Sequence, residues 1–234
     1  WTSSRDTTLG MNFTGVSYYD GQAFMVASDL GVQSAKELDG AAVCTQSGTT
    51  SELNLSDYFR INNMTYDAAV FDSPEQSIAG FEAGRCDVLS SDASQLYAQR
   101  IQLADPNMAV VLPEIISKEP LGPAVRQGDD QWFNIVKWSL FAMLNAEELG
   151  VSQANVDEQL SSDNPDVMRL LGQDGDFGEA MGLQPDWAYQ IVKQVGNYAD
   201  IYDRNVGTES DFNIARGLNA LWNDGGIQYA PPIR

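Results

Sequence analysis

The chain has 234 residues, 43% of them hydrophobic, which is enough for one large or two small hydrophobic cores. Its 13 Lys and Arg residues stand against 33 Asp and Glu residues. The resulting formal net charge of −20 disfavours binding to nucleic acid and to anionic membranes. No run approaches the roughly 18 consecutive apolar residues that a membrane-spanning helix needs.

The residue inventory argues against catalysis and against a bound metal or nucleotide. Histidine is absent, so Ser–His and Cys–His nucleophilic pairs and histidine metal sites are excluded. The chain also lacks the glycine-rich phosphate loops of nucleotide-binding proteins. We therefore expect a protein that is not an enzyme and that uses no cofactor or metal.

The first part of the chain, residues 1–27, is expected to contain the end of a strand at 13–15, followed by a crossover segment. An apolar run at 23–27 closes this segment, and a short helix is expected at 34–38. No internal repeat or low-complexity segment indicates a different architecture.

A buried strand at 42–46 leads through a Ser-Gly-Thr-Thr turn at 47–50 into a helix. The first turn of a helix has free backbone N–H groups and a partial positive charge, and the hydroxyls of Thr49 and Thr50 lie beside them. This turn is therefore a candidate anion site. Thr49 can equally be an ordinary N-cap, because Glu52 follows it at the spacing of a capping box. The two roles are compatible.

Two further strand–helix units follow, with strands at 68–71 and 86–91 and helices at 74–82 and 92–97. Such alternation predicts a parallel sheet that binds ligands at the carboxyl ends of its strands. Asp92 should lie at this edge together with Thr49 and Thr50, either as an N-cap or as the partner of a cation. An anion site near a carboxylate matches the two charged ends of an amino acid.

The only two cysteines, Cys44 and Cys86, fall on neighbouring strands of this predicted sheet. Such strands lie about 4.8 Å apart, so the two side chains can reach disulfide geometry. Two buried free thiols are the alternative.

The second half of the chain is predicted to be mainly helical. Pro113, Pro120 and Pro123 mark a return crossover whose strand lies at 122–126. A helix is expected from residue 131 to residue 149, closed by Gly150. The segment 161–182 is expected to form loops with short helical turns. Further helices are expected at 187–195, 197–204 and 214–222.

Several collinear stretches resemble one protein family. The stretches at 47–52, 82–88 and 91–92 resemble the second lobe of the periplasmic amino-acid-binding proteins that serve ABC importers, which are bacterial extracellular solute-binding proteins of family 3. A second group of stretches is similar to the branch that binds L-amino acids in general: 112–123, 127–133, 216–222 and 228–234. The resemblance covers essentially the whole chain.

The resemblance implies an α/β fold of the type II periplasmic-binding-protein class, in which two lobes close around the ligand. Residues 1–27 would be a remnant of lobe one and the crossover, 28–122 an intact lobe two, and 123–234 the return crossover and the C-terminal helical part of lobe one. A disulfide like that expected here is common in the family, and the oxidising periplasm permits it.

The resemblance also implies ligand contacts. Arg5, Thr49 and Thr50 would hold the α-carboxylate of an L-amino acid, and Asp92 would hold its ammonium. Thr14 lies in a segment that lines the same cleft in the family. The partners implied are an L-amino acid and the membrane subunits of an ABC importer, and the location implied is the periplasm, for a mature form without its signal peptide.

The chain departs from the family at its start: we expect the first strands of lobe one to be missing and lobe one to be truncated. A sheet deprived of strands leaves unpaired backbone groups and apolar surface, which partners tend to cover. We therefore expect a homo-oligomer that associates through lobe one. The alternative function is that of an oligomeric interaction protein that has lost its ligand.

Overall fold

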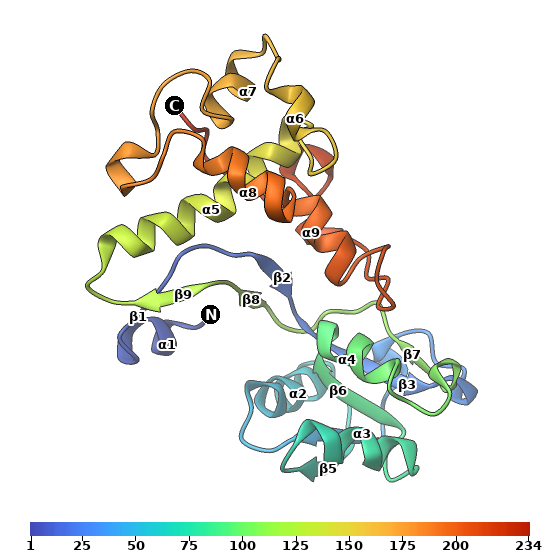
Figure 1. The fold of residues 1–234 in the computed structure, drawn as a ribbon. Coiled ribbons are helices and arrows are strands. Elements are labelled where there is room, and N and C mark those ends of the chain that lie inside the picture. The colour runs from blue at the N-terminus through green and yellow to red at the C-terminus, as the bar shows by residue number, and fades with distance from the viewer. The chain divides into compact units, whose positions relative to one another are not determined.

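The computed structural model describes residues 1–234, and the chain divides into two compact units. Unit 1 comprises residues 1–19 and 121–234, and unit 2 comprises residues 20–120 (Figure 1). The first crossover therefore lies before the boundary expected at residue 27. The reason is that the apolar run after residue 22 is a strand of the unit 2 sheet, whereas we expected it to belong to the crossover.

Unit 2 is built on a five-stranded sheet with the strand order β5-β4-β6-β3-β7. Its strands are β3 (Gln22–Ala27), β4 (Ala41–Gln46), β5 (Tyr66–Phe71), β6 (Val88–Asp92) and β7 (Ala109–Val111). Strands β4, β5 and β6 are parallel, as the strand–helix alternation predicts. β3 runs antiparallel to both of its neighbours, so the complete sheet is mixed.

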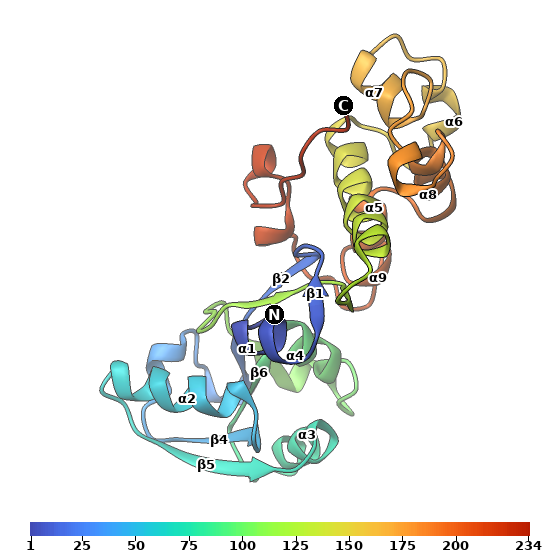
Figure 2. The ribbon, with the colours of Figure 1, turned by 90° about the vertical axis from the view of Figure 1, so that its left-hand side faces the viewer.

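Helices cover both faces of this sheet. α2 (Thr50–Ile61) packs on one face, where Leu55 and Phe59 join Phe24 in a buried cluster, and Figure 2 shows α2 lying along β4. α3 (Pro74–Glu82) and α4 (Ala93–Arg100) pack against the other face. The helix predicted at 34–38 is a short 3₁₀ turn, Ala35–Glu37.

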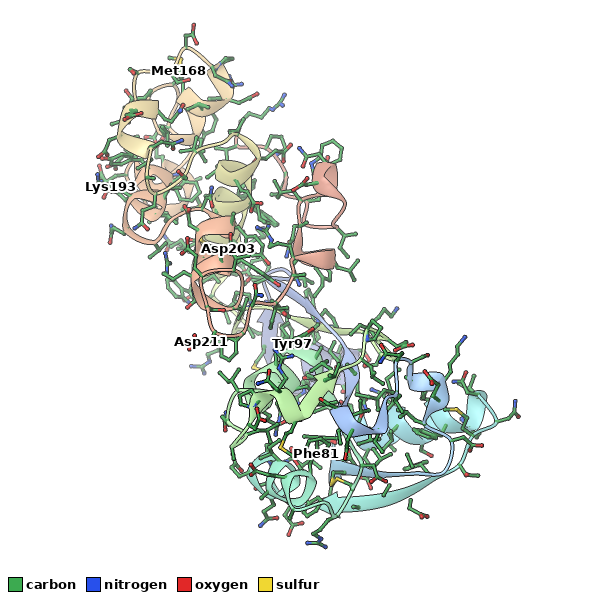
Figure 3. All side chains as sticks on the ribbon, turned by 90° about the vertical axis from the view of Figure 1, so that its right-hand side faces the viewer. Phe81, Tyr97, Met168, Lys193, Asp203 and Asp211 are labelled. Carbon is green, nitrogen blue, oxygen red and sulfur yellow. A yellow bond between two sulfur atoms is a disulfide. The ribbon has the colours of Figure 1, made fainter.

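Cys44 and Cys86 form a disulfide, with their Cα atoms 5.6 Å apart, so the predicted pairing is confirmed. Cys86 lies just before β6, which begins at Val88, whereas the sequence analysis placed it at the first residue of that strand. The bridge is buried in the same cluster as Phe81, which is labelled in Figure 3.

Unit 1 contains two short strands and most of the helices. α1 (Ser3–Thr8) precedes β1 (Met11–Phe13), which pairs antiparallel with β9 (Ala124–Arg126). The connecting strands β2 (Tyr18–Asp20) and β8 (Glu119–Leu121) pair where the chain passes from one unit to the other. The helices are α5 (Asp130–Glu148), α6 (Val156–Gln159), α7 (Pro165–Leu170), α8 (Trp187–Val195) and α9 (Tyr198–Asn205). None of the helices is both long and apolar enough to cross a membrane.

The helix predicted at 214–222 is wrong. Two 3₁₀ turns, Gly217–Asn219 and Trp222–Asp224, stand there with an isolated bridge between Leu221 and Gln228. Gly217 adopts a φ of +49°, which interrupts a helix. The apolar spacing that suggested a buried face is misleading, because Leu218 and Trp222 are 56% and 52% exposed.

Candidate functional site

The carboxyl end of β4 leads into an open first turn of α2. The Thr49 hydroxyl caps this helix, accepting a hydrogen bond from the Glu52 N–H at 3.3 Å and donating one to the Gln46 carbonyl at 2.7 Å. The Glu52 carboxylate accepts the Gly48 N–H at 2.9 Å. The N-cap role is therefore present. The hydroxyl of Thr50 is exposed and makes no hydrogen bond within the chain, so it is available to an anion.

Strand pairing places Asp92 on the face of the sheet that α2 covers. Asp92 is the antiparallel partner of Gln22, and directly opposed residues project their side chains to the same face. The Gln22 side-chain amide donates to the Ser51 carbonyl in the first turn of α2 at 2.9 Å. The same nitrogen donates to the Ser90 hydroxyl, also at 2.9 Å. The start of α2 and the end of β6 are thus joined.

Asp92 occupies the N-cap position of α4 without capping it. No hydrogen bond reaches its carboxylate from the first turn of the helix. Asp20 supplies the cap instead. Its carboxylate accepts the backbone N–H groups of Gly21 at 2.9 Å and Ser94 at 3.4 Å, together with the Ser94 hydroxyl. The ordinary alternative for Asp92, an N-cap, therefore fails, and its carboxylate is free to meet a cation.

The surroundings of Asp92 are acidic. Partial burial, then the nearby charges of Asp20 and Glu119, raise the pKa of Asp92 to about 6. Glu119 is itself held in place, because its carboxylate accepts the Asn54 side-chain amide at 3.2 Å and the Ser117 hydroxyl at 2.9 Å. Such an arrangement favours a positively charged ligand group, which would relieve the repulsion among the carboxylates.

Metal binding has no support in the arrangement of these side chains. No group of three or more His, Cys, Asp or Glu side chains is placed so that it could hold a metal ion. The site combines an open helix N-terminus with an unpaired carboxylate, and these two features suit the carboxylate and the ammonium of a zwitterion.

No family model matches the chain. It is 59% identical over 236 residues to the general L-amino acid-binding periplasmic protein AapJ of Rhizobium johnstonii, a match that covers 100% of this chain and 69% of the relative. It is also 50% identical over 235 residues to the glutamate/glutamine/aspartate/asparagine-binding protein BztA of Rhodobacter capsulatus, covering 100% of this chain and 70% of the relative. The chain belongs to the amino-acid-binding proteins of ABC transporters.

A solved structure confirms the fold of this family. The periplasmic binding protein of an ABC transporter from Brucella ovis, with glutathione bound, is 53% identical to the chain with a TM-score of 0.94, and the match covers 100% of this chain and 74% of that one. The α/β periplasmic-binding-protein fold is therefore as expected. The relatives are transporter binding proteins and not enzymes, and their names give no support to an interaction protein that has lost its ligand.

Two of the expected ligand residues belong to unit 1. Arg5 is exposed on the short helix α1, and its side chain forms no hydrogen bond or ion pair. Thr14 is buried, and its hydroxyl and its N–H both donate to the Pro123 carbonyl, at 3.3 Å and 2.9 Å. In unit 2 the structure brings Thr49, Thr50 and Asp92 to one edge of the sheet.

Sequence reasoning missed Asp20, Gln22 and Glu119. Asp20 and Gln22 lie on the incoming crossover and the strand that follows it, and Glu119 lies on the outgoing crossover, far from Asp92 in sequence. No local pattern marks these residues. The antiparallel pairing of β3 with β6 brings Gln22 beside Asp92, and a pattern of apolar residues does not specify strand direction.

Proposed function

We propose that this chain binds L-amino acids and presents them to the membrane subunits of an ABC importer in the periplasm. The α-carboxylate would lie at the first turn of α2, on Thr49 and Thr50, and the α-ammonium on Asp92. The observation that carries this proposal is the carboxylate of Asp92, which is free because Asp20 accepts the hydrogen bond from the first turn of α4 in its place.

The chemistry of each end of the ligand is distinct. The N–H groups of Thr50 and Ser51 have no acceptor in the chain, so they and the Thr50 hydroxyl can donate to a carboxylate. The helix dipole adds about 0.3–1 kcal/mol for an anion at this position. Asp92 offers a charge-assisted acceptor to the ammonium, and such bonds are worth about 1.5–3 kcal/mol.

The relatives support the class of ligand and the location. AapJ is named as a general L-amino acid-binding periplasmic protein, and the structure from Brucella ovis holds glutathione. Glutathione carries a free α-ammonium and α-carboxylate at its glutamyl end, the two groups that the site in unit 2 is equipped to hold.

A thermal-shift screen with the common L-amino acids and glutathione tests the proposal. A ligand at about 100 times its dissociation constant adds about 2.7 kcal/mol of stability, which for a protein of this size corresponds to roughly 5–10 °C in Tm. At least one L-amino acid should give such a shift. An unchanged Tm with every compound at millimolar concentration would contradict the proposal.

Asp92→Asn should weaken amino-acid binding by about 1.5–3 kcal/mol, because the amide keeps the shape of the side chain and removes the charge that pairs with the ammonium. Isothermal titration calorimetry measures the loss. Asp67→Asn is the matched control, since it removes the same charge from an exposed position of β5 in the same unit. Equal affinities of the wild type and Asp92→Asn would remove Asp92 from the site.

Two further roles rest on the family resemblance alone. Arg5 would bind the carboxylate of the ligand, and Thr14 would line the cleft. Arg5→Ala and Thr14→Val belong in the same calorimetric series. Arg5→Ala should lower the affinity without changing Tm, because the Arg5 side chain makes no contact whose loss would destabilise unit 1.

Amino-acid affinity should fall as the pH drops below about 6, because protonated Asp92 cannot pair with an ammonium. The raised pKa has a second consequence: the unliganded fold should gain stability as the pH falls from about 6 towards about 4, where only the folded state holds the proton. A bound ammonium lowers this pKa, so binding near pH 6 should release protons. Calorimetry in buffers of different ionisation enthalpy measures this release, and heats that do not depend on the buffer would contradict it.

We further propose self-association through unit 1. The β1–β9 sheet has only two strands, and sheet edges of this kind tend to pair with other chains. Unit 1 also exposes large apolar side chains, namely Leu9, Trp132, Leu218, Trp222 and Tyr229. Light scattering at micromolar concentration should give a mass above the 25.6 kDa of one chain, and a monomeric mass at every concentration would refute this proposal.

A further inference from the structure

Gln22 is a fully buried polar residue at the start of β3, with an exposed fraction of 0%. It lies on the same face of the sheet as Phe24, beneath α2, where an apolar side chain would be ordinary. Its side-chain oxygen, Oε1, is buried without a hydrogen-bond partner, and leaving an acceptor unpaired costs free energy. Gln22 is therefore a polar side chain at a position where an apolar one would avoid the cost of the unpaired oxygen.

The amide nitrogen of Gln22 connects the two halves of the proposed site. One hydrogen bond reaches the Ser51 carbonyl, in the turn of α2 that would receive the carboxylate, and the other reaches the Ser90 hydroxyl. Ser90 lies two residues before Asp92 on β6, and its hydroxyl donates onward to the Ala23 carbonyl at 3.0 Å. A single side chain thus holds both charged ends of the site.

The backbone of Gln22 is also fixed. Its N–H donates to the Ser117 hydroxyl at 3.2 Å, its carbonyl accepts the Ile116 N–H at 2.8 Å, and β3 pairs with β6 along its length. Apolar packing is not directional, so Phe24, Leu55 and Phe59 define the position of α2 along its own axis less sharply than hydrogen bonds do. Hydrogen bonds from a fixed donor supply that position.

We propose that Gln22 is a positioning residue that sets the spacing between the first turn of α2 and Asp92, so that both ends of an amino acid are bound at once. This inference rests on the proposed function. Its consequence is that removing the amide should weaken binding without destabilising the fold, because the buried unpaired oxygen is removed at the same time.

The test is Gln22→Met, which keeps the length of the side chain and removes its donors. Affinity for the L-amino acid that gives the largest thermal shift should fall about tenfold, or about 1.4 kcal/mol, the effect of misaligning one charge-assisted hydrogen bond. Tm should stay equal to that of the wild type or rise. Gln99→Met is the matched control: Gln99 is 5% exposed, its amide donates to the Pro74 carbonyl at 3.2 Å, and its Oε1 is also unpaired, but it lies on α4 against the other face of the sheet.

A double-mutant cycle with Asp92→Asn separates positioning from a general structural effect. If Gln22 aligns the two ends, Gln22→Met should cost much less once the charge of Asp92 is gone, so the two losses should not add. Additive losses, or an unchanged affinity in Gln22→Met, would overturn the inference. The proposed function would still hold after such a result, provided that the wild type binds the amino acid and Asp92→Asn does not. Should Gln22→Met fail to fold, Ser90→Ala removes one acceptor of the amide and should give a smaller loss in the same direction, and an unchanged affinity there would be decisive against the inference.

Discussion

Replacing Cys44 and Cys86 together by alanine should lower the free energy of unfolding of unit 2 by about 4 kcal/mol. The two cysteines are 42 residues apart, and on the chain-entropy model a crosslink of this span removes about 4 kcal/mol of conformational freedom from the unfolded state. Both side chains are buried beside Leu89 and Phe81, so the loss of packing adds to the entropic effect. Urea denaturation followed by far-ultraviolet circular dichroism measures the change.

The distribution of tryptophan makes the assignment to unit 2 testable. All five tryptophans lie in unit 1, so their fluorescence follows that unit alone: Trp1, Trp132, Trp138, Trp187 and Trp222. The cysteine variant should shift the circular dichroism transition more than the fluorescence transition. Thiol counting on the denatured, unreduced wild type should find no free thiol, and two free thiols would show that the bridge is absent.

Arg216→Ala should destabilise unit 1 by about 1–3 kcal/mol, because it leaves the partly buried carboxylate of Glu147 without its partner. The Arg216 guanidinium donates to both carboxylate oxygens of Glu147, at 2.9 and 3.1 Å, and these side chains are only 22% and 15% exposed. The same group lies 5.2 and 5.0 Å from the ring centres of Tyr198 and Tyr202 and donates to the Asn219 carbonyl. It therefore joins α5, α9 and the C-terminal segment.

The loss of stability in Arg216→Ala should be large because of Glu147, the carboxylate that remains. Partial burial raises the pKa of Glu147 even with Arg216 beside it, so without the guanidinium this partly buried carboxylate would be unpaired. Tryptophan fluorescence during denaturation should show an earlier transition in Arg216→Ala. Arg204→Ala, at an exposed position of α9, should change stability far less. The double variant Arg216→Ala/Glu147→Ala should recover part of the loss, and equal midpoints for Arg216→Ala and the wild type would contradict the argument.

Where a local pattern specifies a structure, the sequence was sufficient to predict it. The helices predicted at 74–82 and 187–195 have the same bounds in the structure, as α3 and α8. The strand, turn and helix around Thr49 and the pairing of Cys44 with Cys86 were also correct. These features depend on residues that are close in sequence or on adjacent parallel strands.

What the sequence did not reveal depends on contacts that a pattern of apolar residues does not encode. The position of Asp92 between a strand and a helix left an N-cap role open beside ammonium binding, and only the structure shows that Asp20, from the crossover, caps α4 instead. Residues 214–222 have helical apolar spacing, yet Gly226 packs against the Ala220 carbonyl so closely that a Cβ atom there would lie 1.9 Å from the oxygen. That close return of the chain bends the segment into turns.

In the function proposed here, one edge of the unit 2 sheet binds both charged ends of an amino acid. Calorimetry at about pH 8, where Asp92 is ionised, tests it with three compounds: the L-amino acid that gives the largest thermal shift, the amine that lacks its α-carboxylate, and the acid that lacks its α-ammonium. We expect the amino acid to bind and each analogue to lose at least about tenfold in affinity, since each lacks the partner of one end of the site. Binding of either analogue as tightly as the amino acid would contradict it.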